Sequence, residues 1–327
     1  MKLIIQIPCY NEEKTLPLTL ADLPKSIKGV DRIETQIVDD GSTDGTIETA
    51  KRLGVNHIVR FKHNKGLAMA FKAGVDNALA QGADILVNTD GDNQYCGADI
   101  AKLVEPIVNG TSDMVIGCRP IDTHPEFSFF KKKLQRLGSW VLRKVSNTTV
   151  EDASSGFRAY SREAMIHINV FSSFSYCLET IIQAGYDNLK ITTCDIRINR
   201  RTRPSRLFRN LIQYLWKSGK TILNIFLLYR STQLFSFLSL IFLLAGFALV
   251  ARYLFLISFS SSVAGTFWPT IVLAGVLLAI SFQMFLTGLL ASLISSNRKL
   301  SEEVLLKLRK MESKSSREAV QPQRENP

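Results

Sequence analysis

The chain has 327 residues, of which 46% are apolar and 21% are charged, and its mean hydropathy is +0.08. This composition excludes an intrinsically disordered polymer, because such chains lack the apolar side chains needed to build a core. The net charge of +11 is regional, since residues 1–195 carry 22 Lys and Arg against 24 Asp and Glu, whereas residues 196–327 carry 18 against 5. A nucleic-acid-binding domain is typically basic over its folded part, so we expect no nucleic-acid partner.

The first 200 residues alternate between strand-like and helix-like segments, which predicts an α/β domain with a mainly parallel, helix-covered sheet. In such sheets ligands bind at the carboxyl ends of the strands. The five cysteines form no C-x-x-C pair, and together with the lack of a signal peptide they predict reduced thiols inside the cell. The expected strands lie in residues 4–8, 35–39, 57–61, 84–90 and 113–117, and the clearest helices in 66–82 and 99–108.

Residues 231–297 contain a single charged residue, Arg252, within two apolar stretches at about 234–257 and 269–294. Each stretch exceeds the roughly 20 residues that cross a bilayer, so the sequence predicts a transmembrane hairpin. Lys and Arg flank both ends of the hairpin, whereas the short connection carries none, and this asymmetry predicts a multi-pass inner (cytoplasmic) membrane protein with both termini cytoplasmic. The flanking cations are Arg197, Arg200, Arg201, Arg203, Arg206, Arg209, Lys217, Lys220 and Arg230 before the hairpin, and Arg298 and Lys299 after it.

Residues 201–230 mix apolar and basic side chains, which predicts interfacial amphipathic helices attracted to anionic lipids. A helix packed on the soluble domain is the alternative. Residues 298–327 form a predicted cytoplasmic tail, in which Ser301 would cap a new helix before a disordered end. The expected organisation is therefore a catalytic domain at 1–200, interfacial helices at 201–230, the hairpin at 231–297 and the tail.

Three predicted strands end in polar motifs, IPCYNEE at 7–13, VDDGSTDGT at 38–46 and NTDGDNQY at 88–95. Such Asp-Gly runs are also typical of ordinary turns. Asp90 and Asp92 are two residues apart, and an extended backbone would aim both carboxylates the same way.

Two convergent carboxylates repel unless a cation lies between them, and oxygen ligands favour Mg²⁺ or Mn²⁺, which also bridge phosphate oxygens. Gln94 would add a carbonyl ligand. Because Walker A and G-x-G-x-x-G motifs are both absent from the sequence, we expect a diphosphate held through a metal ion.

These motifs occur in the order found in glycosyltransferase family 2, together with HNKGLAMAFKAG at 63–74 and EDASSGFR at 151–158. Over roughly residues 1–210 the chain resembles the polyprenyl-phosphate (dolichol-phosphate mannose synthase-like) sugar transferases that carry a C-terminal two-helix membrane anchor. The resemblance implies a Rossmann-like fold of the GT-A, nucleotide-diphospho-sugar transferase type. It also implies an inverting, metal-dependent transfer from a nucleotide sugar to polyprenyl or undecaprenyl phosphate.

The resemblance assigns site residues position by position. The nucleotide's base and ribose would contact Pro8, Tyr10, Glu12 and Asp39, and the metal and diphosphate would be held by Asp90, Asp92 and Gln94. Arg119 and Arg200 would face phosphates, and Asp152, which heads D-x-x-S-G-F-R, would lie near the reacting centre. The acceptor phosphate would be bound by Lys132, Arg136, Arg200, Ser205 and Arg206, although Arg203 stands where the family's R-x-x-G-x-S-K pattern has glycine.

A phosphate acceptor has a second pKa near 6 and is already a nucleophile at neutral pH, so we expect Asp152 to position groups, with base catalysis secondary. A UDP-sugar is the favoured donor, with GDP-mannose as an alternative, and a homo-oligomer stays open. Two other functions are weighed. A processive polysaccharide synthase would carry Q-x-x-R-W, which the run from Gln213 to Trp216 lacks, and a non-catalytic membrane-bound nucleotide-binding relative would not need intact metal carboxylates.

Overall fold

The computed structural model describes residues 1–120, 150, 152–170, 176–199, 211–259 and 268–320. The chain divides into a sheet unit, formed by residues 1–218 with 306–327, and a hairpin unit, formed by residues 219–305. The expected acceptor residues fall outside the described ranges; they are Lys132, Arg136, Arg200, Ser205 and Arg206.

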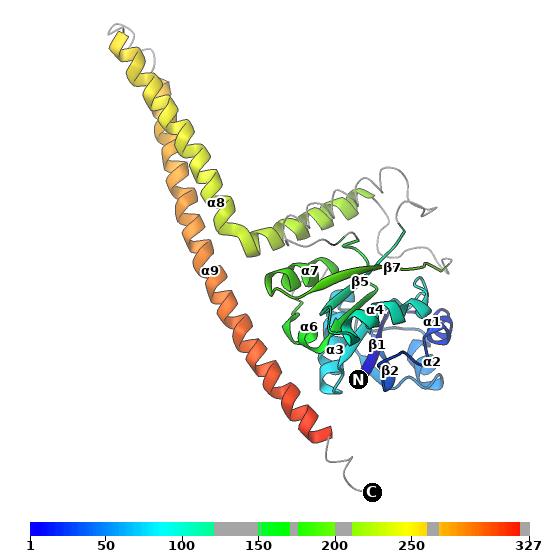
Figure 1. Ribbon diagram of the computed structural model, residues 1–327. Helices are drawn as coiled ribbons and strands as arrows, with labels where there is room; N and C mark the ends of the chain where they lie inside the picture. The colour runs from blue at the N-terminus through cyan, green and yellow to red at the C-terminus, as the bar shows by residue number, and fades with distance from the viewer. Residues whose placement is uncertain (121–149, 151, 171–175, 200–210, 260–267, 321–327) are drawn as a thin grey trace. The chain divides into compact units, whose positions relative to one another are not determined.

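The sheet unit contains a seven-stranded sheet in the order β3-β2-β1-β4-β6-β5-β7 (Figure 1). Its strand pairs are parallel except those of β6, which runs antiparallel to both β4 and β5. The predicted mainly parallel sheet is therefore confirmed. The strands are β1 (Lys2–Cys9), β2 (Arg32–Asp39), β3 (His57–Arg60), β4 (Ile85–Asn88), β5 (Met114–Cys118), β6 (Arg158–Ser161) and β7 (Ile191–Asp195).

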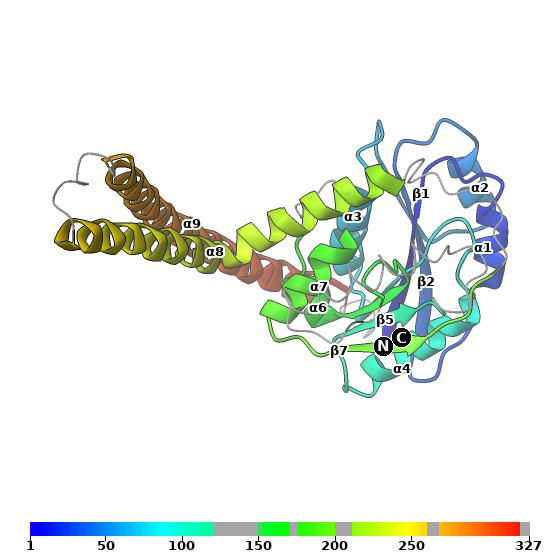
Figure 2. The same ribbon diagram turned by 90° about the horizontal axis from the view of Figure 1, so that it is seen from above.

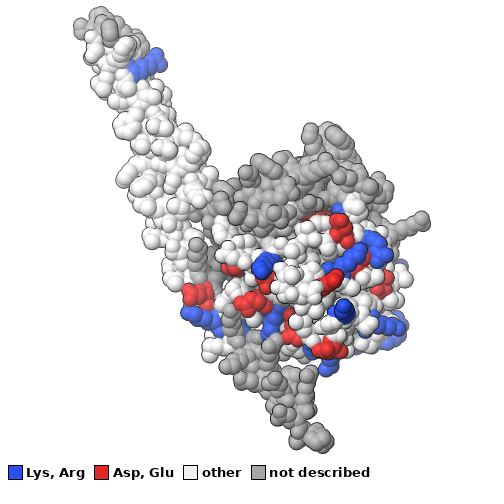
Figure 3. Space-filling model, viewed as in Figure 1, with Lys and Arg blue, Asp and Glu red and all other residues white. Residues whose placement is uncertain are grey.

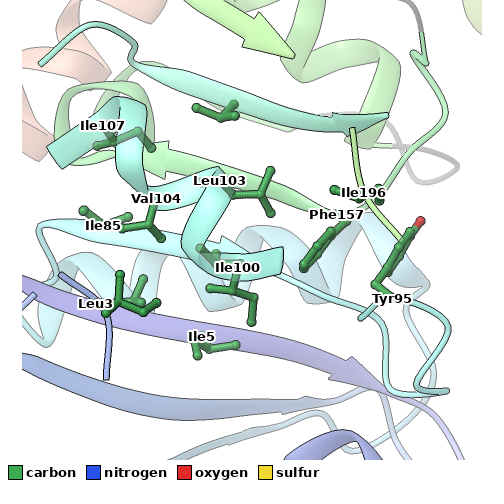
Figure 4. Close-up of a cluster of buried hydrophobic side chains, with 14 residues drawn as sticks. Leu3, Ile5, Ile85, Tyr95, Ile100, Leu103, Val104, Ile107, Phe157 and Ile196 are labelled. Atoms are coloured by element: carbon green, nitrogen blue, oxygen red, sulfur yellow. The ribbon is translucent and has the colours of Figure 1, made fainter. Parts of the chain in front are cut away.

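Helices cover both faces of this sheet (Figure 1, Figure 2). Leu3 and Ile5 of β1 pack against α4 in a cluster that includes Ile100 and Leu103 (Figure 4). Gln6, which points to the opposite face because strand side chains alternate, donates to the carbonyl of Phe71 in α3. The helices are α1 (Leu16–Asp22), α2 (Thr46–Arg52), α3 (Leu67–Ala80), α4 (Ile100–Val108), α6 (Arg162–His167) and α7 (Tyr176–Tyr186).

The strand register gathers the polar motifs at one edge of the sheet. Cys9 at the end of β1 pairs with Asp39 at the end of β2, and Gln6 pairs with Asn88 at the end of β4. The loops that follow these parallel strands therefore leave the sheet side by side, as the sequence predicted.

The hairpin unit is built from most of α8 (Leu211–Phe259) and of α9 (Trp268–Val320). The first residues of α8, up to Ser218, and the C-terminal part of α9, from Leu306, belong to the sheet unit. The segments Thr232–Ser258 and Trp268–Asn297 are long and apolar enough to cross a membrane. Large apolar side chains on them are exposed, with 63% for Phe237, 61% for Leu244 and 61% for Leu290. A buried core helix of a soluble protein would hide such side chains, and Figure 3 shows the hairpin almost free of charge.

The two helices of the hairpin contact each other through small residues. The hydroxyl of Ser239 donates to the carbonyl of Ser281 at 3.0 Å, and the hydroxyl of Ser281 donates to the carbonyl of Ser239 at 2.9 Å. A Cβ atom at Gly246 would lie 2.8 Å from the Leu278 side chain, so any larger residue would force that side chain to shift. Close packing of small residues with hydroxyl hydrogen bonds is typical of helix pairs in membranes.

The C-terminal tail differs from the expectation. Helix α9 continues without a break to Val320, and the hydroxyl of Ser301 donates to the carbonyl of Asn297 one turn earlier. The predicted helix start at Ser301 is therefore wrong. The residues that follow it are mostly good helix formers, so the helix propagates and the serine is accommodated in its interior.

Candidate active site

The loops after β1 and β2 are joined by hydrogen bonds. The Glu12 N–H donates to the hydroxyl of Thr46 at 2.9 Å, and the buried Glu12 carboxylate accepts from the Thr15 hydroxyl at 2.6 Å. Asp39 is fully buried, where its Oδ1 accepts from the Ser42 N–H at 3.1 Å. The structure thus brings Glu12 and Asp39 to one edge of the sheet, next to the buried Pro8 and the exposed Tyr10.

Asp40 is a structural anchor that the sequence reasoning missed. Its two carboxylate oxygens accept from the N–H groups of Lys65 and Gly66 at 2.7 and 2.9 Å, although burial raises the pKa of this carboxyl. Gly41 has a φ of 75°, and a Cβ there would lie 2.6 Å from the His63 carbonyl carbon. The HNKG segment at 63–66 is therefore held against the end of β2 by hydrogen bonds to Asp40 and by close packing on Gly41. Successive side chains of a strand point to opposite faces of the sheet, so the neighbouring Asp39 and Asp40 are expected to have different partners. This alternation is the signal in the sequence that predicts separate roles for them.

Asp90 and Asp92 lie in the loop after β4, which ends at Asn88. Gly91 and Asp92 form a turn, so the expected extended backbone between the two aspartates is wrong. The Gln94 N–H donates to Asp92 Oδ1 at 3.3 Å. A Cβ on Gly91 would lie 3.4 Å from the carbonyl oxygen of Pro8, so this loop packs back on the end of β1.

No group of three or more His, Cys, Asp and Glu side chains suited to a metal is found among the described residues. Asp90, Asp92 and Gln94 are partly exposed and supply two carboxylates and an amide. Beside them, Gly156 has no side chain, and a Cβ there would lie 3.4 Å from Asp90 Oδ1. Mg²⁺ is commonly held by one or two carboxylates together with water and substrate phosphates, so this donor set fits such an ion.

Arg119 and Asp152 form a two-pronged ion pair. The Nε of Arg119 donates to Asp152 Oδ2 at 2.7 Å and its Nη2 donates to Oδ1 at 2.9 Å. The hydroxyl of Ser154 also donates to Oδ1, at 3.0 Å. Burial alone would raise the pKa of Asp152, but the Arg119 guanidinium and Ser154 hold it below its ordinary value. The carboxylate is therefore ionised at neutral pH and is a weak proton acceptor.

Arg158, the last residue of the D-x-x-S-G-F-R motif, is fully buried and holds the loop that carries Asp152. Its guanidinium donates to the carbonyls of Ser155 at 2.7 Å, Ala153 at 2.9 Å and, in α7, Cys177 at 2.7 Å. This arginine therefore fixes the backbone, a role that spacing in the sequence did not reveal.

Arg197, counted above among the cations that flank the hairpin, is tied to the sheet unit. Its Nη2 donates to Asp99 Oδ1 at 2.9 Å, and its N–H donates to Asp99 Oδ2 at 2.7 Å. Asp99 is buried and also contacts Lys102 at 3.0 Å. The charge of Arg197 is thus neutralised by an aspartate 98 residues away, a partner that counting charges along the flank could not reveal.

Residues 4–168 match the family described as Glycosyl transferase family 2. The chain belongs to this family. Family 2 membership and the activity class of glycosyltransferase, both predicted from the motifs, are confirmed.

Two relatives have a lipid-linked phosphate in their names. The UDP-N-acetylglucosamine–dolichyl-phosphate N-acetylglucosaminyltransferase of Methanococcus voltae is 33% identical over 213 residues, which cover 58% of this chain and 83% of the relative. The polyprenol monophosphomannose synthase of Mycolicibacterium smegmatis is 28% identical over 185 residues, which cover 54% of this chain and 68% of the relative.

The family 2 domain has the GT-A fold, as predicted. Glucosyl-3-phosphoglycerate synthase from Mycobacterium tuberculosis, solved with Mn²⁺, UDP and glucosyl-3-phosphoglycerate, aligns with a TM-score of 0.50 at 18% identity. The alignment covers 68% of this chain and 77% of that one. At this identity the likeness concerns the fold.

Proposed function

We propose that this family 2 enzyme transfers a sugar, with inversion, from a nucleotide sugar to polyprenyl phosphate, giving a polyprenyl-phosphate sugar. The favoured donor is a UDP-sugar, and GDP-mannose is the alternative. The relatives from Methanococcus and Mycolicibacterium, whose names include a lipid phosphate or polyprenol, support the acceptor class. The two names print different sugars, so they do not select one donor for this chain, and the donor panel described below is the test.

The observation that carries the proposal is the engaged carboxylate of Asp152. Both of its oxygens accept hydrogen bonds from Arg119, so little capacity is left to remove a proton from a hydroxyl acceptor. A phosphate monoester needs no such base, because near neutral pH it is largely a dianion. In this proposal Asp152 orients the Arg119 guanidinium, and Arg119 binds a phosphate of the substrates through its remaining donor capacity.

On the donor side, Asp39, Glu12 and Tyr10 would contact the nucleoside beside Pro8, and Asp90, Asp92 and Gln94 would hold Mg²⁺ or Mn²⁺. A bound divalent ion neutralises the charge that develops on the departing diphosphate. The acceptor phosphate would meet Lys132, Arg136, Arg200, Ser205 and Arg206.

We further propose that the hairpin crosses the inner membrane with both ends on the cytoplasmic side. Arg309, beyond the second apolar segment, donates to the carbonyls of Ile166 and Ile168 at 3.3 and 2.7 Å and pairs with Asp76 at 2.8 Å. These contacts lie within the sheet unit, and they join its residues 306–327, which follow the second apolar segment, to its residues 1–218, which precede the first. A chain that touches the same domain before and after two spans must cross an even number of times, and this supports the hairpin topology.

Topology is tested by single cysteines introduced at Ser258 and Asn297, the ends of the two apolar segments, in a variant whose five native cysteines are replaced by serine. A membrane-impermeant maleimide added to intact cells should label the cysteine at 258 and should reach that at 297 only after lysis. Labelling of both in intact cells would contradict the proposed orientation.

The activity is tested with the purified full chain, undecaprenyl phosphate and a panel of UDP-glucose, UDP-N-acetylglucosamine and GDP-mannose. We expect one donor to give a single lipid-linked sugar, with turnover that requires Mg²⁺ or Mn²⁺ and is lost in Asp90→Ala with Asp92→Ala. Glu105→Gln, an exposed acid on α4, serves as the matched control and should keep full activity.

The same assay separates the alternatives. A polymeric product would support a processive polysaccharide synthase, and the lack of any product with every donor would support a non-catalytic nucleotide-binding protein. Undiminished turnover of the double alanine variant in chelator would overturn the metal-dependent mechanism.

A further inference from the structure

The peptide groups on both sides of Gly156 are held by three buried side chains. The Gly156 N–H donates to the hydroxyl of Tyr95 at 3.3 Å. Its carbonyl accepts from Asn88 Nδ2 at 2.9 Å and from the hydroxyl of Tyr176 at 3.2 Å. Tyr95 in turn stacks on Phe157 with a centroid distance of 4.9 Å. Such complete hydrogen bonding in the interior fixes a peptide in one place.

These contacts connect the two halves of the candidate site. Asn88 and Tyr95 flank the loop that carries Asp90 and Asp92, whereas Gly156 follows Asp152 in the D-x-x-S-G-F-R motif. A Cβ at Gly156 would lie 2.8 Å from the Tyr176 hydroxyl and 3.4 Å from Asp90 Oδ1.

The orientation of Asn88 is set by a chain of buried amides. Gln6 Nε2 donates to Asn88 Oδ1 at 3.0 Å, which leaves Asn88 Nδ2 for the Gly156 carbonyl and the Tyr176 hydroxyl. Gln36 Nε2 extends the chain by donating to the carbonyl of Gly74 in α3 at 2.9 Å and to Gln6 Oε1 at 3.4 Å. Buried amides are costly unless they are paired, so this chain serves to hold one arrangement of the site.

We propose that the Gly156 peptide, which is hydrogen-bonded by Asn88, Tyr95 and Tyr176, fixes the position of the Asp90 carboxylate relative to the Arg119–Asp152 pair. The three side chains are positioning residues, since they act through the Gly156 peptide. The inference rests on the proposed function, because it concerns how the same site holds the metal and the diphosphate.

The test uses the purified full chain and Mn²⁺-dependent binding of UDP and of GDP, measured by calorimetry, with a thermal melt for each variant. In Gly156→Ala the added methyl group meets Asp90 and the Tyr176 hydroxyl, and we expect the nucleotide affinity with Mn²⁺ to fall by about ten-fold, as for other changes behind metal ligands. Affinity without Mn²⁺ should change little.

The decisive variant is Gly156→Ala combined with Tyr176→Phe. Removing the hydroxyl frees the space that the methyl group needs, while Asn88 still donates to the Gly156 carbonyl, so the double variant should regain part of the lost affinity. A merely structural role of Tyr176 would make the two changes additive in both affinity and melting temperature. Tyr160→Phe is the matched control, because Tyr160 and Tyr176 both pack on the Phe71 ring, at centroid distances of 5.6 and 4.1 Å, whereas the Gly156 peptide is hydrogen-bonded by Asn88, Tyr95 and Tyr176 and not by Tyr160.

If Gly156→Ala does not fold, the single variants Tyr95→Phe and Tyr176→Phe test the inference instead. Each should weaken Mn²⁺-dependent nucleotide binding, while Tyr160→Phe leaves it unchanged. If all three variants bind nucleotide with the wild-type affinity, this inference is overturned and the proposed function is not affected. Additive behaviour of the double variant would also overturn it. A wild-type protein that binds neither nucleotide with Mn²⁺ would overturn the proposed function and this inference with it.

Discussion

Arg119 and Asp152 are 33 residues apart in the sequence, yet two hydrogen bonds of 2.7 and 2.9 Å join the guanidinium to both oxygens of the carboxylate. Arg119 directly follows β5, and Asp152 begins the loop that Arg158 fastens from behind. Two residues predicted separately, one for a phosphate and one for the reacting centre, therefore act as one unit.

Replacing Asp152 with Asn should lower kcat by about 10- to 100-fold, because Asn cannot accept two hydrogen bonds from Arg119 and the guanidinium loses its orientation. The pKa of Asp152 lies below its ordinary value, so this residue does not titrate between pH 5 and 9. The pH–rate profile of the variant should keep the acidic limb of the acceptor phosphate, near pH 6, at reduced height.

Ser154→Ala is the control for this variant. It removes the Ser154 hydroxyl, which donates a hydrogen bond to Asp152, but keeps the Asp152 carboxylate. Its activity should stay within a few-fold of the wild type. Loss of the acidic limb in Asp152→Asn, or activity below detection with normal substrate binding, would instead identify Asp152 as an essential base.

Acid should destabilise the sheet unit through Asp99. Burial alone would raise the pKa of Asp99, but hydrogen bonds from Arg197 and the charge of Lys102 lower it below the ordinary value. A carboxylate with a depressed pKa contributes stability that is present above its unfolded pKa and is lost as the pH falls through the folded pKa.

Asp99→Asn should therefore lower the melting temperature by a few degrees at pH 7, and the difference from the wild type should shrink below roughly pH 4. Thermal melts of both proteins from pH 3 to 8 measure this. A difference that is constant over the whole range would show that the charge of Asp99 does not contribute.

Gly74→Ala should destabilise the sheet unit by about 1–3 kcal/mol, although alanine is the better helix former. The reason is that a Cβ at this position in α3 would lie 2.2 Å from Gln6 Oε1. Gly219→Ala in α8 is the matched control, because no atom of the described residues lies within 4 Å of its Cβ position. Equal melting temperatures for Gly74→Ala and the wild type would contradict the tight packing of α3 on β1.

The packing of the hairpin is tested by a cysteine pair at Ser239 and Ser281, whose hydroxyl oxygens lie 3.2 Å apart. We expect a disulfide to form within one chain when membranes are treated with a mild oxidant, because sulfur atoms in place of these oxygens would lie close enough to bond after a small adjustment. Mass spectrometry of the linked peptides detects it. The pair at Leu244 and Ser281 is the control and should stay unlinked, since Leu244 is exposed; a bridge only between chains would show that α8 and α9 pack otherwise.

Much of this protein was readable from the order of its residues. Apolar runs located β1 to β5 and the two apolar helices, because burial against one partner layer imposes a short-range pattern on the chain. The Asp-Gly motifs at the strand ends and their order identified the family before any partner was known. Strands β6 and β7 and the continuity of α9 were missed, since their local patterns are weak.

The partners of individual charges were decided by the tertiary structure alone. Nothing in the sequence pairs Arg119 with Asp152, Arg197 with Asp99 or Gly156 with Asn88, since each pair spans dozens of residues. Parallel strands need long crossover connections, so residues distant in the chain meet at the same sheet edge. Local periodicity describes which face of an element is buried, and it carries no information about which distant side chain will satisfy a buried charge.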